Sequence, residues 1–163
     1  MDINLRLTKY AYFMEIAKAV AKRSPCCSRQ VGCVLVDQYD HILATGYNGP
    51  PKGVSHCTSC QRLEPGRDLY KCQAVHAEMN ALIQCKDTNA IKHIFITINP
   101  CEICLRMLAN TPAQNIFCDD EYTYESAEYA IKFWSSLGRK IVFGALYGNE
   151  HLKYLELLNV TKS

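Results

Sequence analysis

The sequence has no long uninterrupted apolar stretch, and this absence excludes one class of protein at once. Nowhere do about 18 apolar residues follow one another, which is roughly the length that a membrane-spanning helix needs. The first residues contain no basic segment followed by an apolar one, the pattern of a secretory signal. We therefore expect a soluble, cytoplasmic protein without a membrane partner.

The sequence also has little excess of charge of either sign. Its 163 residues include 18 Lys and Arg against 16 Asp and Glu, so the formal net charge is +2. No segment carries a long Lys/Arg run, and we therefore expect no polymeric nucleic acid as a partner. Low-complexity segments and internal repeats are absent, and 48% of the residues are hydrophobic. This balance predicts a single domain over residues 1–163.

Cysteine, in contrast, is abundant, with ten residues in the chain. In a sequence without a secretory signal, paired cysteine spacings favour metal binding over disulfide bonds. Six of the ten lie at such spacings. The other four are expected to be small buried side chains: Cys27, Cys33, Cys85 and Cys118.

The hydrophobic pattern predicts an α/β protein. Apolar residues recur at helical spacing over 8–20, and two short apolar runs then flank a turn, as in a β-hairpin. Strand and helix patterns alternate from residue 74 to residue 158, which predicts parallel strands joined by helical crossovers. The expected strands are 31–36, 41–47, 92–98, 115–118 and 140–143, and the expected later helices are 74–86, 102–109, 124–137 and 150–158. Between them, residues 48–71 form a long loop of a kind that is uncommon unless it is functional.

Two short motifs indicate chemistry. Residues 76–78 read His-Ala-Glu, and residues 100–104 read Pro-Cys-Glu-Ile-Cys. A His-x-Glu motif followed by Pro-Cys-x-x-Cys is the signature of zinc-dependent nucleobase deaminases. The sequence therefore predicts a hydrolytic zinc site.

His76, Cys101 and Cys104 are the candidate ligands of the catalytic zinc. A catalytic zinc takes three protein ligands and one water, whose pKa it lowers to about 7. The start of a helix, where both cysteines are expected, stabilises thiolates. Glu78 would move protons between the water, ring N3 and the departing ammonia. The alternative, a closed structural zinc or a redox Cys-x-x-Cys, leaves the His-x-Glu spacing unexplained.

Further segments make the sequence resemble the deoxycytidylate deaminases of bacteriophages and bacteria. These are Cys-Cys-Ser at 26–28, Val-Gly at 31–32, Thr-Gly-Tyr-Asn-Gly-Pro-Pro-Lys-Gly at 45–53 and His-Ala-Glu-Met-Asn-Ala at 76–81. The resemblance implies a three-layer α/β/α cytidine-deaminase-like fold with a central mixed sheet of about five strands. It also implies hydrolysis of dCMP to dUMP and ammonia for thymidylate synthesis, by a homohexamer in the cytoplasm, or in the host cytoplasm for a phage enzyme.

The resemblance extends to substrate contacts. It implies that Asn48 binds the 3′-hydroxyl of the sugar and that Tyr122 reaches the 5′-phosphate. A cation at Arg29 would complement the phosphate, although a solvated surface charge is an equal alternative for this side chain.

A second, structural zinc is expected in an insertion at about 48–73. Phage relatives carry such an ion, and Cys26 and Cys57 match two of its ligands, whereas Ala74 stands where another would be. Cys60 and Cys72 would complete the site, because Cys-x-x-Cys has ligand spacing. His56 is the alternate ligand, and the other interpretation is a set of reduced thiols.

The resemblance also implies regulation by nucleotide effectors, namely activation by dCTP with Mg²⁺ and inhibition by dTTP. The segment 46–53 supplies glycines that let a triphosphate approach the backbone, and one cation, Lys52. The expected effector residues are Gly46, Asn48, Gly49, Lys52 and Gly53. The alternative is that they only shape a turn.

Two rival functions remain at this point. One is an enzyme that deaminates free cytidine or a base in RNA or single-stranded DNA. The other is a zinc-stabilised binding module without catalysis, against which Glu78 argues.

Overall fold

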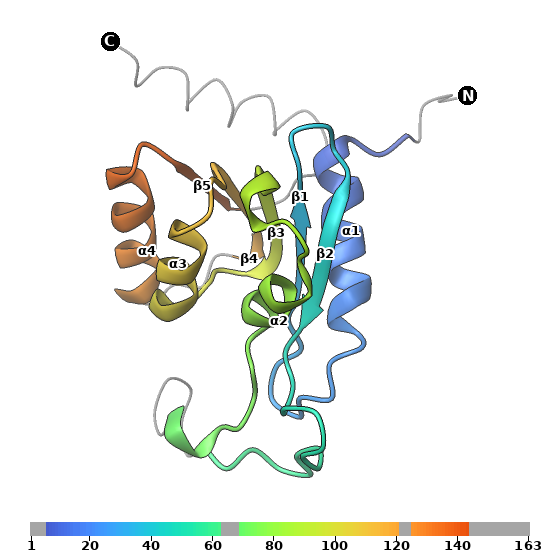
Figure 1. Cartoon of the computed structure of the whole chain (residues 1–163). Helices are drawn as coiled ribbons and strands as arrows, with labels where there is room; N and C mark the ends of the chain where they lie inside the picture. The colour runs from blue at the N-terminus through green and yellow to red at the C-terminus, as the bar shows by residue number, and fades with distance from the viewer. Residues whose placement is uncertain (1–5, 63–68, 121–124, 144–163) are drawn as a thin grey trace, which may run out of the picture.

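The computed structural model describes residues 6–62, 69–120 and 125–143. Five strands form one mixed sheet in the order β2-β1-β3-β4-β5 (Figure 1). β1 pairs antiparallel with both β2 and β3, whereas β3, β4 and β5 run parallel. The strands are β1 (Gly32–Val36), β2 (Ile42–Tyr47), β3 (His93–Ile98), β4 (Asn115–Asp120) and β5 (Lys140–Phe143).

Four helices cover the sheet in the described ranges: α1 (Lys9–Ala21), α2 (Ala77–Gln84), α3 (Glu102–Ala109) and α4 (Glu125–Ser136). Helix α1 begins after Thr8, whose Oγ1 accepts a hydrogen bond from the amide of Ala11 at 3.2 Å. It lies against one face of the sheet, while α2, α3 and α4 cover the other. This arrangement gives three layers, α/β/α.

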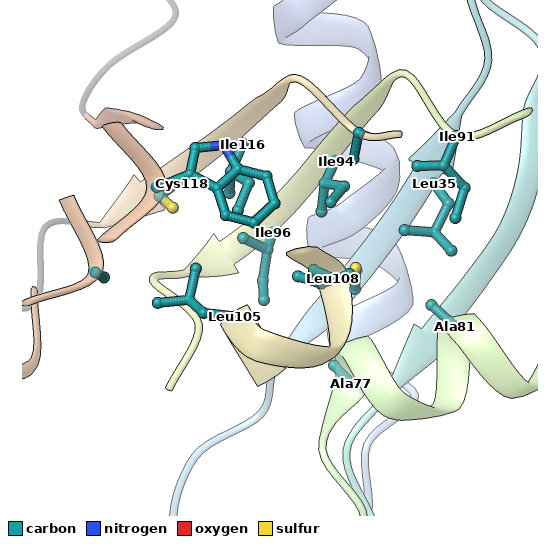
Figure 2. Packing of buried hydrophobic residues seen from close by; sticks show 14 of the residues in the cluster. Leu35, Ala77, Ala81, Ile91, Ile94, Ile96, Leu105, Leu108, Ile116 and Cys118 are labelled. Atoms are coloured by element: carbon teal, nitrogen blue, oxygen red, sulfur yellow. The ribbon is translucent and has the colours of Figure 1, made fainter. Parts of the chain in front are cut away.

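Each face of the sheet has its own apolar core, because successive strand residues point to opposite sides. On the α1 side, Phe13 and Met14 pack against Val34 and Phe95. On the other side, the leucines of α3 and the alanines of α2 face the strand isoleucines (Figure 2). The starts of α2 and α3 pack against this second core.

Two glycines set the distance between the sheet and its helices. A Cβ at Gly32 would lie 2.0 Å from the carbonyl oxygen of Ala17 in α1. A Cβ at Gly46 would lie 2.2 Å from the carbonyl oxygen of Ala77 in α2. Both helices therefore approach the sheet through positions that only glycine can occupy at this spacing.

The observed elements confirm the expected fold and sheet. The helix expected at 74–86 is shorter in the structure, where α2 begins at Ala77 and ends at Gln84. The expected long loop contains the short 3₁₀ helix η1 (Leu69–Lys71), and a second one, η2 (Thr88–Ala90), precedes β3. The expected last helix, 150–158, lies outside the described residues. Within these ranges, none of the helices has the length and apolar character to cross a membrane.

Candidate active site

The three predicted zinc ligands meet at the starts of two helices. Cys101 Sγ and Cys104 Sγ each lie 3.5 Å from Nδ1 of His76. The ligand atoms of the three residues lie within 4.8 Å of one another. In the part of the chain that the structure describes, no other group of three His, Cys, Asp or Glu residues comes this close together.

Both helix starts place a predicted zinc ligand where a capping residue usually stands. His76 is the N-cap of α2 and Cys101 is the N-cap of α3, and neither side chain makes a capping hydrogen bond. Ser, Thr, Asp or Asn at these positions would stabilise the helices by a capping hydrogen bond. Both helices lack this stabilisation. The two side chains are instead turned toward each other, and the set of one imidazole and two sulfurs fits a zinc ion.

The paired sulfurs differ in acidity. Hydrogen bonding from Cys104, and next from His76, lowers the pKa of Cys101 to about 4 against the opposing effect of burial. The pKa of Cys104 is raised, because this thiol donates its hydrogen bond to Cys101 and is buried. The hydrogen bond to Cys101 also raises the pKa of His76. At neutral pH the site therefore holds a ready thiolate, the form that binds metal.

Glu78 lies in the first turn of α2 with only 4% of its surface exposed. Burial raises the pKa of its carboxyl group from 4.5 to about 7, which outweighs the lowering effects of the local backbone and His76. Both protonation states are accessible near neutral pH, as a group that accepts and returns protons requires.

Comparisons with known proteins agree with this geometry. The family model for the cytidine and deoxycytidylate deaminase zinc-binding region matches residues 7–119. The chain belongs to this deaminase family. A deoxycytidylate deaminase of a Mycobacterium phage is 36% identical over 115 residues, covering 64% of this chain and 89% of the phage protein.

Other relatives are longer. The deoxycytidylate deaminase of Schizosaccharomyces pombe is 36% identical over 126 residues, which are 71% of this chain but 38% of the yeast protein. Among solved structures, the dCMP deaminase of cyanophage S-TIM5 in complex with dCMP and dUMP is similar, with a TM-score of 0.65 and 26% identity. That similarity covers 81% of this chain and 93% of the phage chain.

Of the expected substrate residues, Asn48 lies close to the predicted zinc ligand His76. The next residue, Gly49, forms a two-way backbone bridge with Val75, the residue before His76, at 3.1 and 2.8 Å. The side chain of Asn48 is buried and bound to other protein groups. The side chain of Arg29 is exposed. Tyr122 lies outside the described residues.

The four expected ligands of the second zinc line one small cavity of about 30 Å³. Their sulfurs do not form a group of three within 4.8 Å, a finding that concerns the described residues only. The guanidinium of Arg62 also lines this cavity, and a hydrogen bond with Cys60 raises its pKa. His56 is exposed and is not one of the described residues that line the cavity.

The expected effector residues fall into two groups. Lys52 and Gly53 are exposed, and Gly53 has a φ of +88° that favours glycine. Gly46 and Gly49 are buried, Gly46 against the backbone of α2 and Gly49 against the ring of Pro25. At both glycines the side on which a Cβ would stand is occupied, and the role of these residues in binding a triphosphate stays a prediction.

Three features of the site escaped the sequence analysis. Ser24 was not among the candidate site residues, yet its buried hydroxyl group binds Asn48. Asn80 donates a hydrogen bond from Nδ2 to the carbonyl oxygen of Tyr47 at 2.7 Å, which ties α2 to the end of β2. Cys27, expected to be buried, is exposed and lines the same cavity as the four expected ligands of the second zinc. The two hydrogen bonds join residues 24 and 33 positions apart, so no local pattern indicated them.

Proposed function

We propose that this deaminase hydrolyses dCMP to dUMP and ammonia. The observation that carries the proposal is the His76, Cys101 and Cys104 cluster with the buried carboxyl group of Glu78 beside it. The names of the relatives support a deoxycytidine nucleotide as the substrate, and the cyanophage relative is a dCMP deaminase solved with dCMP and dUMP. The product, dUMP, is what a thymidylate-forming reaction consumes.

His76, Cys101 and Cys104 would hold the catalytic zinc. Their three donor atoms lie close together, their side chains make no capping bonds, and one thiol ionises readily. A zinc ion bound there would supply a water activated near neutral pH.

Glu78 would carry two protons during the reaction. The first moves from the attacking water to ring N3, while the water oxygen bonds to C4. The second moves from the new hydroxyl oxygen to the amino nitrogen, so that the C4–N bond breaks and ammonia leaves. A buried carboxyl group with a pKa of about 7 suits both transfers.

Asn48 is proposed to bind the sugar, with Arg29 and Tyr122 serving the phosphate. Nδ2 of Asn48 carries two N–H groups, and one of them donates to the carbonyl oxygen of Arg29 at 2.8 Å. Among the described residues, the other N–H has no protein acceptor, so it is available for a substrate hydroxyl group.

An ammonia-release assay with three substrates tests the function. We expect turnover of dCMP, and far slower release from free cytidine and from a cytosine-containing oligonucleotide. A preference for the nucleoside or the oligonucleotide would replace dCMP as the substrate. No release from any of them, with zinc fully loaded, would favour a binding module.

A second, structural zinc is proposed for Cys26, Cys57, Cys60 and Cys72. Its support is that all four side chains line one cavity, Cys26 from the segment before β1 and the other three from a loop that has little apolar packing. Binding would require the sulfurs to draw together and Arg62 to withdraw from Cys60. Metal analysis should find about two zinc ions per chain, and Cys72→Ser should lose one of them. Cys85→Ser, a change outside this cavity, is the matched control and should keep both.

We also propose effector control by dCTP with Mg²⁺ and by dTTP in a homohexamer. Within residues 46–53, the exposed Lys52 is the cation available to phosphate oxygens. If the proposal holds, dCTP raises the rate at low dCMP concentration, dTTP lowers it, and Lys52→Ala weakens both effects without changing saturated turnover. Indifference of the unmodified enzyme to both nucleotides would refute it, and sedimentation measures the oligomeric state.

A further inference from the structure

The side chain of Asn48 takes the place of a peptide group at the end of the β1–β2 pair. Its Oδ1 accepts a hydrogen bond from the amide of Val31 at 2.7 Å, and its Nδ2 donates to the carbonyl oxygen of Arg29 at 2.8 Å. Its own backbone amide donates to the carbonyl oxygen of Val31 at 3.2 Å. These partners determine which end of the carboxamide is oxygen, because a reversed group would place N–H against N–H.

The hydroxyl group of Ser24 links the side chain of Asn48 to the backbone of Asn48. The hydroxyl group of Ser24 lies 2.7 Å from the carbonyl oxygen of Asn48 and 2.8 Å from its Oδ1, and its proton is shared between the two. Oγ of Ser24 also accepts a hydrogen bond from the amide of Cys26 at 3.1 Å. Ser24 is 4% exposed, so no solvent competes for these bonds. One hydroxyl thus holds both the backbone and the side-chain rotamer of Asn48.

The backbone on either side of Asn48 is also fixed, by hydrogen bonds from the segment that contains the proposed ligand His76. The carbonyl oxygen of Tyr47 accepts from Asn80 of α2, and that of Gly49 accepts from the amide of Val75. Together with the bond from Ser24, three consecutive carbonyl groups, those of residues 47–49, have hydrogen-bond partners. Asn48 therefore has a defined position relative to the start of α2, where His76 lies.

We infer that Ser24 is a positioning residue for sugar recognition: its hydroxyl group holds the Asn48 carboxamide so that the remaining N–H meets the 3′-hydroxyl of the substrate. The inference rests on the proposed function, because it takes the sugar contact of Asn48 from there. Ser24 itself does not touch the substrate. It makes the contact preorganised, so that little freedom of the Asn48 side chain is lost when the substrate binds.

The test compares dCMP with 2′,3′-dideoxycytidine monophosphate, which lacks the 3′-hydroxyl. The readout is the ratio of kcat/KM for dCMP to kcat/KM for the dideoxy analogue. Ser24→Ala should lower this ratio about five-fold, as expected for a weakened neutral hydrogen bond. It should leave the kcat/KM of the analogue within about two-fold of the unmodified value, and in an Asn48→Ala background it should have no further effect on the ratio.

Thr111→Val is the matched control. Thr111 is also a buried residue whose hydroxyl group donates to a backbone carbonyl, that of Leu108, at 2.7 Å and accepts from the backbone amide of Ala113. Its removal should destabilise the fold by a similar amount and leave the ratio unchanged. Ser24→Cys, with a similar shape and a weak donor, gives the same readout where the alanine variant does not fold.

Two outcomes overturn the inference. If Ser24→Ala lowers the kcat/KM of both substrates equally, Ser24 has only a structural role, while the proposed function stands. If the unmodified enzyme deaminates dCMP but shows a ratio of one, the sugar contact of Asn48 fails and the inference fails with it. Absence of dCMP turnover in the zinc-loaded enzyme is a failure of the proposed function itself.

Discussion

Replacing Gly46 by alanine would insert a methyl group between β2 and the start of α2. The added Cβ would lie 2.2 Å from the carbonyl oxygen of Ala77 and 2.3 Å from the amide nitrogen of Ala81. Both atoms belong to helix backbone, so no side-chain rotation relieves the contact. To restore an ordinary separation of 3.4 Å, the helix must retreat by about 1 Å.

That displacement acts on the chemistry because Ala77 stands between His76 and Glu78. A retreat of α2 by about 1 Å moves the proposed ligand His76 and the proposed proton carrier Glu78 away from Cys101 and Cys104, which α3 holds in place. A misplacement of this size in a catalytic group costs about 100-fold in rate. Overpacking of a core position costs about 1–3 kcal/mol of stability.

The assay has a matched control on the opposite face of the sheet. Gly32→Ala places its Cβ 2.0 Å from the carbonyl oxygen of Ala17 in α1, a comparable clash that involves none of the proposed ligands. Both variants should lose thermal stability. At a temperature where both are folded, only Gly46→Ala should lose zinc affinity and most of its kcat on dCMP. Near-normal kcat and zinc affinity in Gly46→Ala, or equal losses in the two variants, would refute this account of how α2 is positioned.

Three further predictions concern the site and its support. Glu78→Gln should keep zinc and the fold but lower kcat by at least about 100-fold, because an amide cannot carry a proton; a variant with near-normal turnover would remove Glu78 from the mechanism. Cys104→Ser should reduce zinc content by one ion per chain, measured by atomic absorption, and abolish dCMP turnover. Trp134→Ala should lower the free energy of unfolding by about 3–5 kcal/mol in a urea titration, since this side chain is fully buried. Its site would stay intact, so kcat of the folded protein should change little.

The local pattern of the sequence was sufficient to predict the elements of the fold. Helical spacing, turn residues and strand-like runs depend on neighbours within a few positions, which is why α3 and β5 appear with the predicted bounds. The proposed metal ligands could be found from the sequence in the same way. The Cys-x-x-Cys spacing places two sulfurs one turn apart on a single helix, and a helix start suits thiolates, so Cys101 and Cys104 needed only one distant partner, His76.

Only the tertiary structure decided the features that depend on close approach between distant segments. The burial that raises the pKa of Glu78 is a property of the assembled layers. The need for glycine at position 46 arises from the backbone of α2, about 30 residues further along the chain. Ser24 holds the Asn48 carboxamide 24 residues away through a hydrogen bond that no periodicity or motif announces. Hydrogen bonds and packing of this kind depend on three-dimensional separation, which sequence spacing does not determine once the chain has turned back on itself.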